Sequence, residues 1–256
     1  MAGSTRQAHD DHVTTMCGRF VLINSSDLRI RFRAIVQEGP DRARGFDPVL
    51  PGDDRLVARY NIAPTQPVVT VTNTDGLRRL EWMRWGLIPY WAKAGSLPRN
   101  TINARADSLA SSGLWKTPLK KTRCLIPADG FYEWEGPKEA RRPRFIQRRD
   151  RALFAFAALY DSWKDPTGTV IRSCSIITTP PNQMMEKIHD RMPAMLSTEA
   201  ESLWLDPMSE DPDRLAALLV PYPSEEMTSF EVSRAVNSAA TESPECIEPA
   251  GQGRLM

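Results

Sequence analysis

Residues 123–134 read RCLIPADGFYEW, and this stretch decides the fold class. Apolar, β-branched and aromatic residues fill its two ends, while Pro127 and Gly130 supply turn signals between them. The pattern predicts one strand over 123–126 and a second over 130–134. A strand pair in the middle of the chain indicates a domain built on β-sheet.

Similar patterns continue on both sides of this pair. Separated by Pro and Gly turn signals, further strands are expected over 67–73, 79–85, 144–147, 152–160 and 170–179. Helices are expected over 181–189, over 198–205 and from Asp211 onward. Another helix after Ser26 is expected to carry Leu28, Phe32 and Ile35 at helical spacing. The sequence therefore predicts one β-rich α+β domain.

The overall composition excludes several classes of protein. Of 256 residues, 41% are hydrophobic and 25% charged, which excludes coiled-coil rods, collagen-like chains and complete disorder. The longest apolar run, 153–160, is far shorter than the ~20 residues of a membrane-spanning helix, so no membrane partner is expected. Residues 1–15 are polar and lack the apolar region of a signal peptide, which predicts a disordered extension. The four cysteines lie far apart, which argues against a disulfide framework and fits a reducing cytosol.

Charge is distributed unevenly along the chain. Of the 33 basic and 32 acidic residues, only three basic but twelve acidic ones lie in 199–256, so residues 1–198 hold 30 basic and 20 acidic residues. Such an asymmetry favours a polyanionic partner. The densest basic stretches, 116–123 and 138–151, are each also typical of solvated loops, so charge alone leaves nucleic acid as one candidate. Residues 38–58, rich in Gly, Pro and charge, predict a long surface loop.

The segment MCGRF, residues 16–20, contains the most distinctive candidate. Methionine before a small residue is a normal start site, and its removal would leave Cys17 with a free α-amine. The amine, with a pKa of about 8, and the thiol, with a pKa of about 8.5, are then both partly nucleophilic near neutral pH. Together they can trap an aldehyde, first as a Schiff base and then as a five-membered thiazolidine. The alternative is that Met16 is internal and Cys17 a small buried hydrophobe.

The segment TINARAD, residues 101–107, contains two polar candidates. Asn103 offers donors and an acceptor for holding a sugar or a backbone atom, and Arg105 can fork a phosphate. Asparagine is also a common turn former, so a purely structural role for Asn103 stays open.

The strand predicted over 130–134 contains a carboxylate among aromatic residues. Desolvation there would raise the pKa of Glu133 and make it a usable proton shuttle. Period-2 alternation puts Tyr132 and Trp134 on one face of the strand and Glu133 on the other. Inward-pointing aromatics would then leave Glu133 in solvent, so both environments stay open.

His189 is the one histidine outside the polar extension, because the other two are His9 and His12. It is the candidate for acid–base work, although a lone histidine is often structural. Without a second histidine in the body, and without closely spaced cysteines, we expect no metal site and no cofactor. A Ser-His-Asp arrangement stays open, but the chain has no G-x-S-x-G elbow.

Six segments together resemble one protein family in sequence and in order. They are MCGRF (16–20), RYNIAPTQ (59–66), WGLIPYW (85–91), NARAD (103–107), RCLIPADGFYEW (123–134) and IHDRMPAML (188–196). The chain is similar to the SRAP family, named for SOS-response-associated peptidase, which includes the abasic-site processing proteins. The resemblance implies an SRAP domain over 16–220, preceded by the extension 1–15 and followed by an acidic tail over 221–256.

The resemblance implies a fold of twisted, mainly antiparallel sheets, partly closed into a barrel and flanked by helices. It also implies a basic groove for single-stranded DNA. Family members cross-link covalently to abasic sites, whose ring-opened sugar is an aldehyde, and this matches the aminothiol chemistry available to Cys17. The implied protein is a DNA-repair sensor of the SOS response that shields the site from strand cleavage. It would act as a monomer in the cytoplasm, and at the nucleoid when DNA is damaged.

The resemblance also implies a role for each matching position. In the chemistry, Cys17 is the nucleophile, Asn103 orients the opened sugar, Glu133 shuttles protons and His189 opens the deoxyribose ring. The DNA contacts are Arg19 and Arg105 on phosphates, Pro64 and Trp85 against bases, and Trp134.

The chain departs from the family pattern at two places. Asp107 stands where the family usually has glutamate, and its shorter reach would alter an arginine contact. Fifteen residues precede Met16, so the chemistry requires that translation starts at Met16 rather than Met1, or that a peptidase or self-processing exposes Cys17.

Three other functions stay open. A thiol peptidase would use Cys17 as nucleophile and His189 as base, and its proteolysis would be confined to the chain's own N-terminus. A non-catalytic single-strand binder would use only the basic groove and Trp85. A plain AP lyase would cleave more strand than it holds as a stable adduct.

Overall fold

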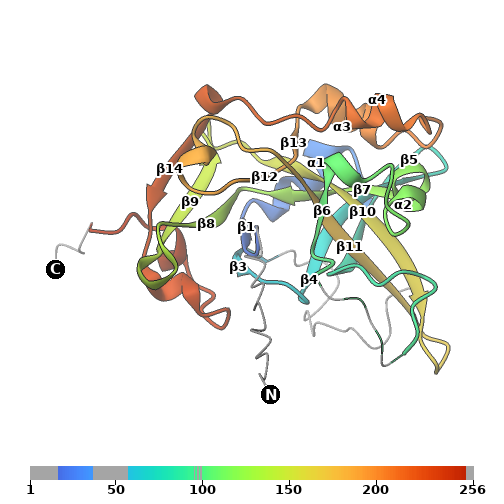
Figure 1. The fold of residues 1–256 in the computed structure, drawn as a ribbon, viewed down its shortest axis with the longest axis horizontal. Helices are drawn as coiled ribbons and strands as arrows, with labels where there is room; N and C mark the ends of the chain where they lie inside the picture. The colour runs from blue at the N-terminus through green and yellow to red at the C-terminus, as the bar shows by residue number, and fades with distance from the viewer. Residues whose placement is uncertain (1–16, 37–56, 95, 97, 99, 252–256) are drawn as a thin grey trace, which may run out of the picture.

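The computed structural model describes residues 17–36, 57–94, 96, 98 and 100–251 (Figure 1). The extension expected over 1–15 and most of the loop expected over 38–58 lie outside the described residues. Two β-sheets form the body of the described part, with short helices around them. In the described part of the chain, no helix combines the length and apolar character needed to cross a bilayer.

The smaller sheet brings together strands from both ends of the chain. Its order is β14 (Met227–Glu231), β9 (Arg142–Arg148), β8 (Gly130–Glu135), β1 (Phe20–Leu22) and β3 (Arg59–Ile62). All its pairings are antiparallel, and β1 pairs with β8 so that Phe20 lies opposite Phe131. The start of the described chain therefore lies beside the strand that contains Glu133 (Figure 1).

The larger sheet closes on itself. Its main path is β12 (Met192–Pro193), β11 (Val170–Thr179), β10 (Phe154–Lys164), β7 (Arg123–Ala128), β4 (Pro67–Thr74), β5 (Leu77–Trp85) and β2 (Ile35–Val36). Because β5 also pairs in parallel with β11, the strands β11, β10, β7, β4 and β5 form a closed ring. The short strands β6 (Asn103–Arg105) and β13 (Met195–Leu196) join β11 and β10. The expected partly closed, mainly antiparallel barrel is confirmed.

Helices occupy the ends and connections of the sheets. The α-helices are α1 (Leu28–Phe32), α2 (Lys116–Lys121), α3 (Thr198–Trp204) and α4 (Pro212–Ala216). The 3-10 turns are η1 (Ser25–Asp27), η2 (Ala106–Ser108), η3 (Lys138–Ala140), η4 (Met185–Lys187), η5 (Ser224–Glu226), η6 (Arg234–Asn237) and η7 (Pro244–Ile247). Ser197 and Asp211 cap α3 and α4 with their side chains, which confirms the helices expected at these two places.

An aromatic cluster joins the two sheets in the core. Phe20 of β1 makes edge contacts with Trp85 of β5 and with Phe156 of β10, at ring-centroid distances of 5.3 and 5.9 Å. Phe131 of β8 meets the same Phe156 at 6.0 Å. All four rings are buried. Since Phe20 is three residues from Cys17, this packing fixes where the N-terminal segment lies.

Gly130 is the first residue of β8, which lies between β1 and β9 in the smaller sheet. It lies opposite Val21 of β1, and a Cβ atom placed on it would lie 2.3 Å from Cζ of Phe145 and 2.8 Å from the carbonyl oxygen of Ile146. No side chain fits at those distances. Glycine therefore allows β8 and β9 to pack as closely as they do.

Two expected helices differ from the structure. Over 181–189, only the turn η4 forms, because the Asn182 side chain donates to the Tyr222 carbonyl and accepts from the Met185 amide, which closes a short turn instead of a helix. The helix expected after Ser26 stops at Phe32, since Arg33 adopts a left-handed φ of 49°. Ile35 consequently lies on β2 and is half exposed.

The chain after residue 220 is part of the fold as far as residue 251, which corrects the separate acidic tail expected over 221–256. Strand β14 completes the smaller sheet, and an isolated bridge joins Val232 to Pro249. Apolar residues that are sparse in the sequence, including Val236 and Cys246, are fully buried there in a small core that they share with Val21, Tyr132 and Phe145 of the smaller sheet. Burial of these few apolar side chains is enough to keep the segment folded despite its acidic composition.

Candidate active site and groove

Cys17 lies at the entrance to β1, next to the carboxylate of Glu133. The ladder between β1 and β8 extends toward it, because the Tyr132 amide donates to the Arg19 carbonyl. The backbone nitrogen of Cys17 donates to Oε1 of Glu133 over 2.5 Å. Cys17 is 3% exposed, and its φ of 44° lies in the left-handed region, which is unusual for a residue other than glycine. The nitrogen that would become the α-amine is therefore in direct contact with an acid–base group.

Glu133 is buried on one face of β8, and its neighbours Tyr132 and Trp134 pack on the other face. The predicted alternation is confirmed, because Tyr132 and Trp134 pack in the small core on one side of β8 while Glu133 meets Cys17 on the other. The inference that inward aromatics would leave Glu133 in solvent is wrong, since both faces of β8 are covered and Glu133 is 3% exposed. Desolvation raises the pKa of Glu133 to about 7, against the lowering effect of the hydrogen bond from Cys17. A carboxyl group with this pKa can both give and accept protons near neutral pH.

The pKa of the Cys17 thiol is raised, whereas the pKa of an activated cysteine is lowered. Burial raises the pKa of the Cys17 thiol well above its usual range, and the negative charge of Glu133 raises it further. Peptidase nucleophiles depend on a lowered thiol pKa. The surroundings of Cys17 therefore favour a reaction in which the thiol adds after another group has reacted first.

His189 follows η4 and is mostly buried. Its Nδ1 lies 2.7 Å from Oδ1 of Asp190 and 3.2 Å from the amide nitrogen of Arg191, two contacts that require opposite protonation of that nitrogen. The shorter contact favours a proton on Nδ1, which leaves the lone pair on Nε2. Burial lowers the pKa of His189 below its ordinary value, so the imidazole is neutral at pH 7.

Asn103 and Arg105 both lie on β6. Asn103 pairs with Ile176 of β11 and is half buried. Arg105 is exposed, and its Nη2 lies 2.8 Å from Oδ2 of Asp107. The same Oδ2 lies 3.0 Å from Nη1 of the buried Arg191, and these two arginines hold the pKa of Asp107 at about 2. Asp107 therefore bridges Arg105 to the segment that contains His189.

An open groove of about 430 Å³ passes beside this region. Its lining residues are Gly18, Arg19, Pro64, Asn100, Ile102 and Trp134. The structure thus brings together three of the five predicted DNA contacts, Arg19, Pro64 and Trp134. Arg105 is exposed to solvent but is not among the lining residues.

Trp85 is wrongly predicted as a residue that contacts bases. Its side chain is fully buried, packs against Phe20, and donates its Nε1 hydrogen to the Ile102 carbonyl. No base can stack on a ring that solvent cannot reach. Two other aromatics of the WGLIPYW segment are exposed instead, namely Tyr90 at 66% and Trp91 at 56%.

The groove residues are supported by the C-terminal strap, the name used here for residues 232–250. The Arg19 guanidinium donates to Oδ1 of Asn61 and to the Val236 carbonyl, both at 2.8 Å. Asn237 of the strap accepts from Arg19 through its carbonyl at 3.3 Å, and through its side chain from Nε1 of Trp134 at 2.7 Å. All these acceptors are neutral, so the positive charge of Arg19 is held in place at the groove without being neutralised by them.

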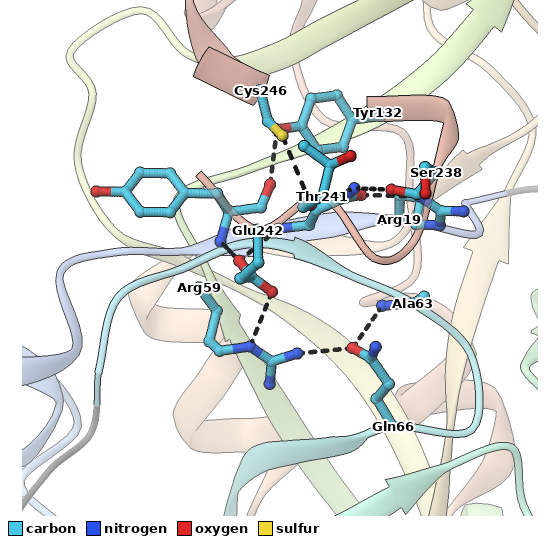
Figure 2. A network of polar contacts seen from close by, with 11 residues as sticks. Arg19, Arg59, Ala63, Gln66, Tyr132, Ser238, Thr241, Glu242 and Cys246 are labelled. Carbon is cyan, nitrogen blue, oxygen red and sulfur yellow. Dashed lines mark hydrogen bonds and ion pairs between the residues drawn. The ribbon is translucent and has the colours of Figure 1, made fainter. Parts of the chain in front are cut away.

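Glu242 of the strap extends this network to Arg59, Gln66 and Ala63 (Figure 2). Its carboxylate accepts from the backbone nitrogens of Tyr60 and Asn61 and from Nε of Arg59. Arg59 in turn donates to Oε1 of Gln66 at 2.6 Å, and that oxygen also accepts from the Ala63 amide, next to Pro64.

Sequence reasoning missed these supporting residues. Asn61, whose amide nitrogen donates to three carbonyls of the strap, and Gln66 lie within the RYNIAPTQ motif, and their place in that motif was the available signal. Glu242 could not be recognised from the sequence, because it lies in the segment that the sequence predicts to be an acidic tail. Among the described residues, no cluster of His, Cys, Asp or Glu side chains is arranged to hold a metal ion.

Comparison with known proteins gives the family of this chain. The sequence profile of the family described as SOS response associated peptidase (SRAP) matches residues 16–239. "Abasic site processing protein YoqW" of Bacillus subtilis (strain 168) is 43% identical over 235 residues, which cover 91% of this chain and 99% of that protein. "Abasic site processing protein HMCES" of Xenopus tropicalis is 35% identical over 265 residues, covering 91% of this chain and 78% of that protein.

Solved structures share the architecture. A crystal structure of a protein from Bacteroides thetaiotaomicron is 30% identical, with a TM-score of 0.68, over 74% of this chain and 84% of that one. A second, from Bordetella bronchiseptica, is 22% identical with a TM-score of 0.69 over 85% of this chain and all of that one, and shows similarity of fold alone.

Proposed function

The chain belongs to the SOS response associated peptidase family, and on that premise we propose that it captures abasic sites in single-stranded DNA as a thiazolidine cross-link through Cys17. The relatives at 43% and 35% identity are named abasic site processing proteins, which supports this substrate. The single observation that carries the proposal is the 2.5 Å contact between the Cys17 nitrogen and Glu133.

The chemistry proceeds in two steps. The α-amine of Cys17 adds to the aldehyde carbon of the opened sugar, and loss of one water gives an imine. The thiol sulfur then adds to the imine carbon while its proton passes to the nitrogen, which closes the five-membered ring. An amine alone would leave the imine in place, and its iminium form promotes strand cleavage by β-elimination. Ring closure removes that iminium and thereby protects the strand.

The two acid–base residues suit these steps. Glu133, with a pKa raised to about 7, can take a proton from the Cys17 amine before attack and return it to the departing water. The buried Cys17 thiol stays protonated, which suits its second place in the sequence of steps. His189, neutral and with Nε2 free to accept, is assigned to the opening of the deoxyribose ring, and Asn103 to the orientation of the opened sugar.

The groove supplies the binding surface for the strand. Arg19 and Arg105 are assigned to phosphates, while Pro64 and Trp134 are assigned to bases. Tyr90 and Trp91 take the stacking role first given to Trp85, because their rings are exposed. Base–aromatic stacking is worth about 1–3 kcal/mol per base and tolerates any sequence. The protein would act as a monomer on DNA in the cytoplasm, and at the nucleoid when DNA is damaged.

A cross-linking assay tests the proposal. Protein whose first residue is shown by mass spectrometry to be Cys17 is mixed with single-stranded DNA that contains one abasic site, and the product is boiled in detergent. We expect a stable adduct, none with undamaged strand or intact duplex, and none with Cys17→Ala. Cys17→Ser should give at best a labile adduct, because a hydroxyl is a poorer nucleophile. Strand cleavage in excess of adduct would identify an AP lyase, and binding without adduct a non-catalytic binder.

A second candidate activity is removal of the chain's own N-terminal residues. The left-handed φ of Cys17 is a strained torsion that exists only while residue 16 is attached, and the bond to be broken lies beside Glu133. Hydrolysis would consume one water and leave a carboxylate on residue 16 and the amine on Cys17. In chain expressed from Met1, intact mass should show a start at Cys17 for the wild type and retained residues for Glu133→Gln. Equal maturation of the two would contradict self-processing.

Cleavage of other peptides is disfavoured by the same site. A thiol peptidase needs a thiolate, and burial keeps the Cys17 thiol protonated. A peptide library should therefore remain uncut under conditions in which abasic DNA is captured.

A further inference from the structure

Asn237 is the last residue of η6 and contacts two residues that line the groove. Its side-chain oxygen Oδ1 accepts a hydrogen bond from Nε1 of Trp134 at 2.7 Å. Its carbonyl oxygen accepts a hydrogen bond from Nη2 of Arg19 at 3.3 Å. Trp134 and Arg19 both line the groove, whereas Asn237 is not among the lining residues. Asn237 is therefore joined to a base contact and to a phosphate contact of the proposed function.

The turn η6 gives the backbone of Asn237 a fixed position. Val236, the preceding residue, is fully buried in the small core. Ser233 caps the turn, because its side chain accepts a hydrogen bond from the Ala235 amide at 3.2 Å. The Val236 carbonyl also accepts from Nη1 of Arg19 at 2.8 Å. The backbone at Asn237 is thus held in place by contacts that do not involve its side chain.

The hydrogen bond to Asn237 fixes the orientation of the Trp134 ring. The ring packs against the small core and also lines the groove. Packing alone restricts the second side-chain torsion of a tryptophan only weakly, because that torsion is broadly distributed. The bond from Nε1 of Trp134 to Asn237 selects one orientation. Since the indole N–H is used in this bond, the ring offers its face to a base rather than a hydrogen-bond donor.

Arg19 keeps one edge of its guanidinium for a ligand. Its Nη1 donates to Asn61 and to the Val236 carbonyl, and its Nη2 donates to the Asn237 carbonyl. Among the described residues, Nε of Arg19 has no hydrogen-bond acceptor, and no carboxylate lies within ion-pair distance of the guanidinium. Nε and the second hydrogen of Nη2 form a two-donor edge of the kind that fits a phosphate. One strap residue, Asn237, thus holds both the phosphate contact and the stacking ring.

We propose that Asn237 is a positioning residue, which orients the Trp134 ring for stacking on a base beside the phosphate that Arg19 holds. The inference rests on the proposed function, in which the groove binds single-stranded DNA. A ring that is already oriented in the free protein loses less freedom when a base stacks on it, so the strand binds more tightly. Asn237 contacts none of the reacting groups, so it acts on strand binding and not on bond formation.

Fluorescence anisotropy with an unreactive strand tests the inference. Labelled single-stranded DNA with a tetrahydrofuran residue at the abasic position carries no aldehyde, so it binds without cross-linking. Asn237→Ala should weaken binding roughly fivefold. The log–log salt slope should stay unchanged, because the backbone carbonyl that holds Arg19 is still present. Ser243→Ala is the matched control and should bind like the wild type, since the Ser243 side chain has no hydrogen bond among the described residues.

The variant Trp134→Phe separates positioning from a structural role. Phenylalanine keeps an aromatic ring but has no N–H, so Asn237→Ala should cause no further loss of affinity in this background. If Asn237 only stabilised the strap, the loss would be the same in both backgrounds. Detachment of η6 from Arg19 would instead lower the salt slope by about 0.7. Either of these two results, or an Asn237→Ala protein that binds as well as Ser243→Ala, overturns the inference.

The reactive strand distinguishes this inference from the proposed cross-linking. At saturating concentrations of the aldehyde strand, Asn237→Ala should form the adduct at the wild-type rate, and a slower rate there would overturn the inference. If the unreactive strand gives the expected results but the wild type forms no adduct with the aldehyde strand, only the proposed cross-linking fails. Failure of the wild type to bind either strand overturns both.

Discussion

The backbone nitrogen of Cys17 and the carboxylate of Glu133 are 2.5 Å apart, although 116 positions separate them in the chain. The pairing of β1 with β8 produces this contact, and the packing of Phe20 between the two sheets holds β1 in place. A buried carboxylate is thereby fixed against one particular nitrogen. The same burial that makes Glu133 useful as an acid and base also makes it costly for the folded state.

Glu133→Gln should change how stability depends on pH. The pKa of Glu133 is about 7 in the folded protein against 4.5 for the ordinary side chain, so the folded state keeps a proton that the unfolded state releases. Protonated Glu133 makes its full contribution to the free energy of unfolding below pH 4.5. This contribution is lost as the pH rises through 7. The full loss is about 3 kcal/mol, at 1.36 kcal/mol for each pKa unit.

Urea unfolding at pH 4.5 and at pH 8 measures this effect. Relative to wild type, Glu133→Gln should gain about 3 kcal/mol in unfolding free energy between the two pH values. In the cross-linking assay, the same variant should react roughly 100-fold more slowly while binding the strand normally. A wild type and variant with parallel pH curves would show that Glu133 has an ordinary pKa.

Substitution of Trp85 should lower the stability of the fold, whereas substitution of Trp134 should weaken DNA binding. Trp85 is fully buried, so Trp85→Ala should destabilise the fold by about 3–5 kcal/mol. Trp134 lines the groove, so Trp134→Ala should weaken binding of single-stranded DNA by about 1–3 kcal/mol. Thermal unfolding and fluorescence anisotropy with labelled strand separate the two effects. A normal melting temperature together with poor binding for Trp85→Phe would contradict the reassignment of Trp85 to the core.

Removing one partner of the ion pair between Arg31 and Glu201 should destabilise the fold more than replacing both partners by apolar residues. The two side chains form two hydrogen bonds, at 2.7 and 2.8 Å, and join α1 to α3, with the Glu201 side chain only 1% exposed. Arg31→Ala leaves a buried charge without a partner and should cost about 3 kcal/mol. The double variant Arg31→Met with Glu201→Met should recover most of that loss, because no charge then remains buried. An equal loss in the single and double variants, measured by urea unfolding, would contradict this explanation.

Glu242 should affect DNA binding although it is not a groove residue. Glu242→Ala removes the acceptor for two backbone amides and for Arg59, so the strap loses a major contact with β3. Unfolding free energy should fall by about 1 kcal/mol. The affinity for single-stranded DNA should fall severalfold, because Pro64 and Arg19 lose support. Glu248→Ala is the matched control, as its exposed side chain has no hydrogen bond or ion pair among the described residues, and it should bind like wild type.

Most of the fold follows from local sequence patterns. Runs such as 67–73 and 170–179 are rich in the β-branched residues Val, Ile and Thr, and they form β4 and β11 nearly as predicted. The expected helix over 181–189 failed because one side chain, Asn182, competes for the backbone hydrogen bonds. The segment after 220 was missed because its few apolar residues show neither helical nor strand periodicity, and only tertiary packing buries them.

The candidate site was likewise only partly predictable from the sequence. Cys17 and Glu133 could be recognised, because a cysteine directly after a methionine and a carboxylate among aromatic residues are both unusual. That both faces of β8 are covered was not predictable, since coverage of Glu133 depends on a residue more than 100 positions away. The environment of Trp85 was misjudged for a related reason, as an aromatic ring in a motif is equally suited to a core and to a binding surface.

The proposed cross-linking depends on Gly130, which lies outside the reacting groups. The missing side chain at that position lets β8 and β9 approach each other closely, because a Cβ atom there would meet Phe145 and Ile146 of β9. A methyl group added there would shift β8 against β9 and displace Glu133 relative to Cys17, leaving both residues unchanged in identity. Loss of capture in a Gly130→Ala protein that still folds would mean that this reaction tolerates almost no error in position, and that a residue with no functional group limits its rate.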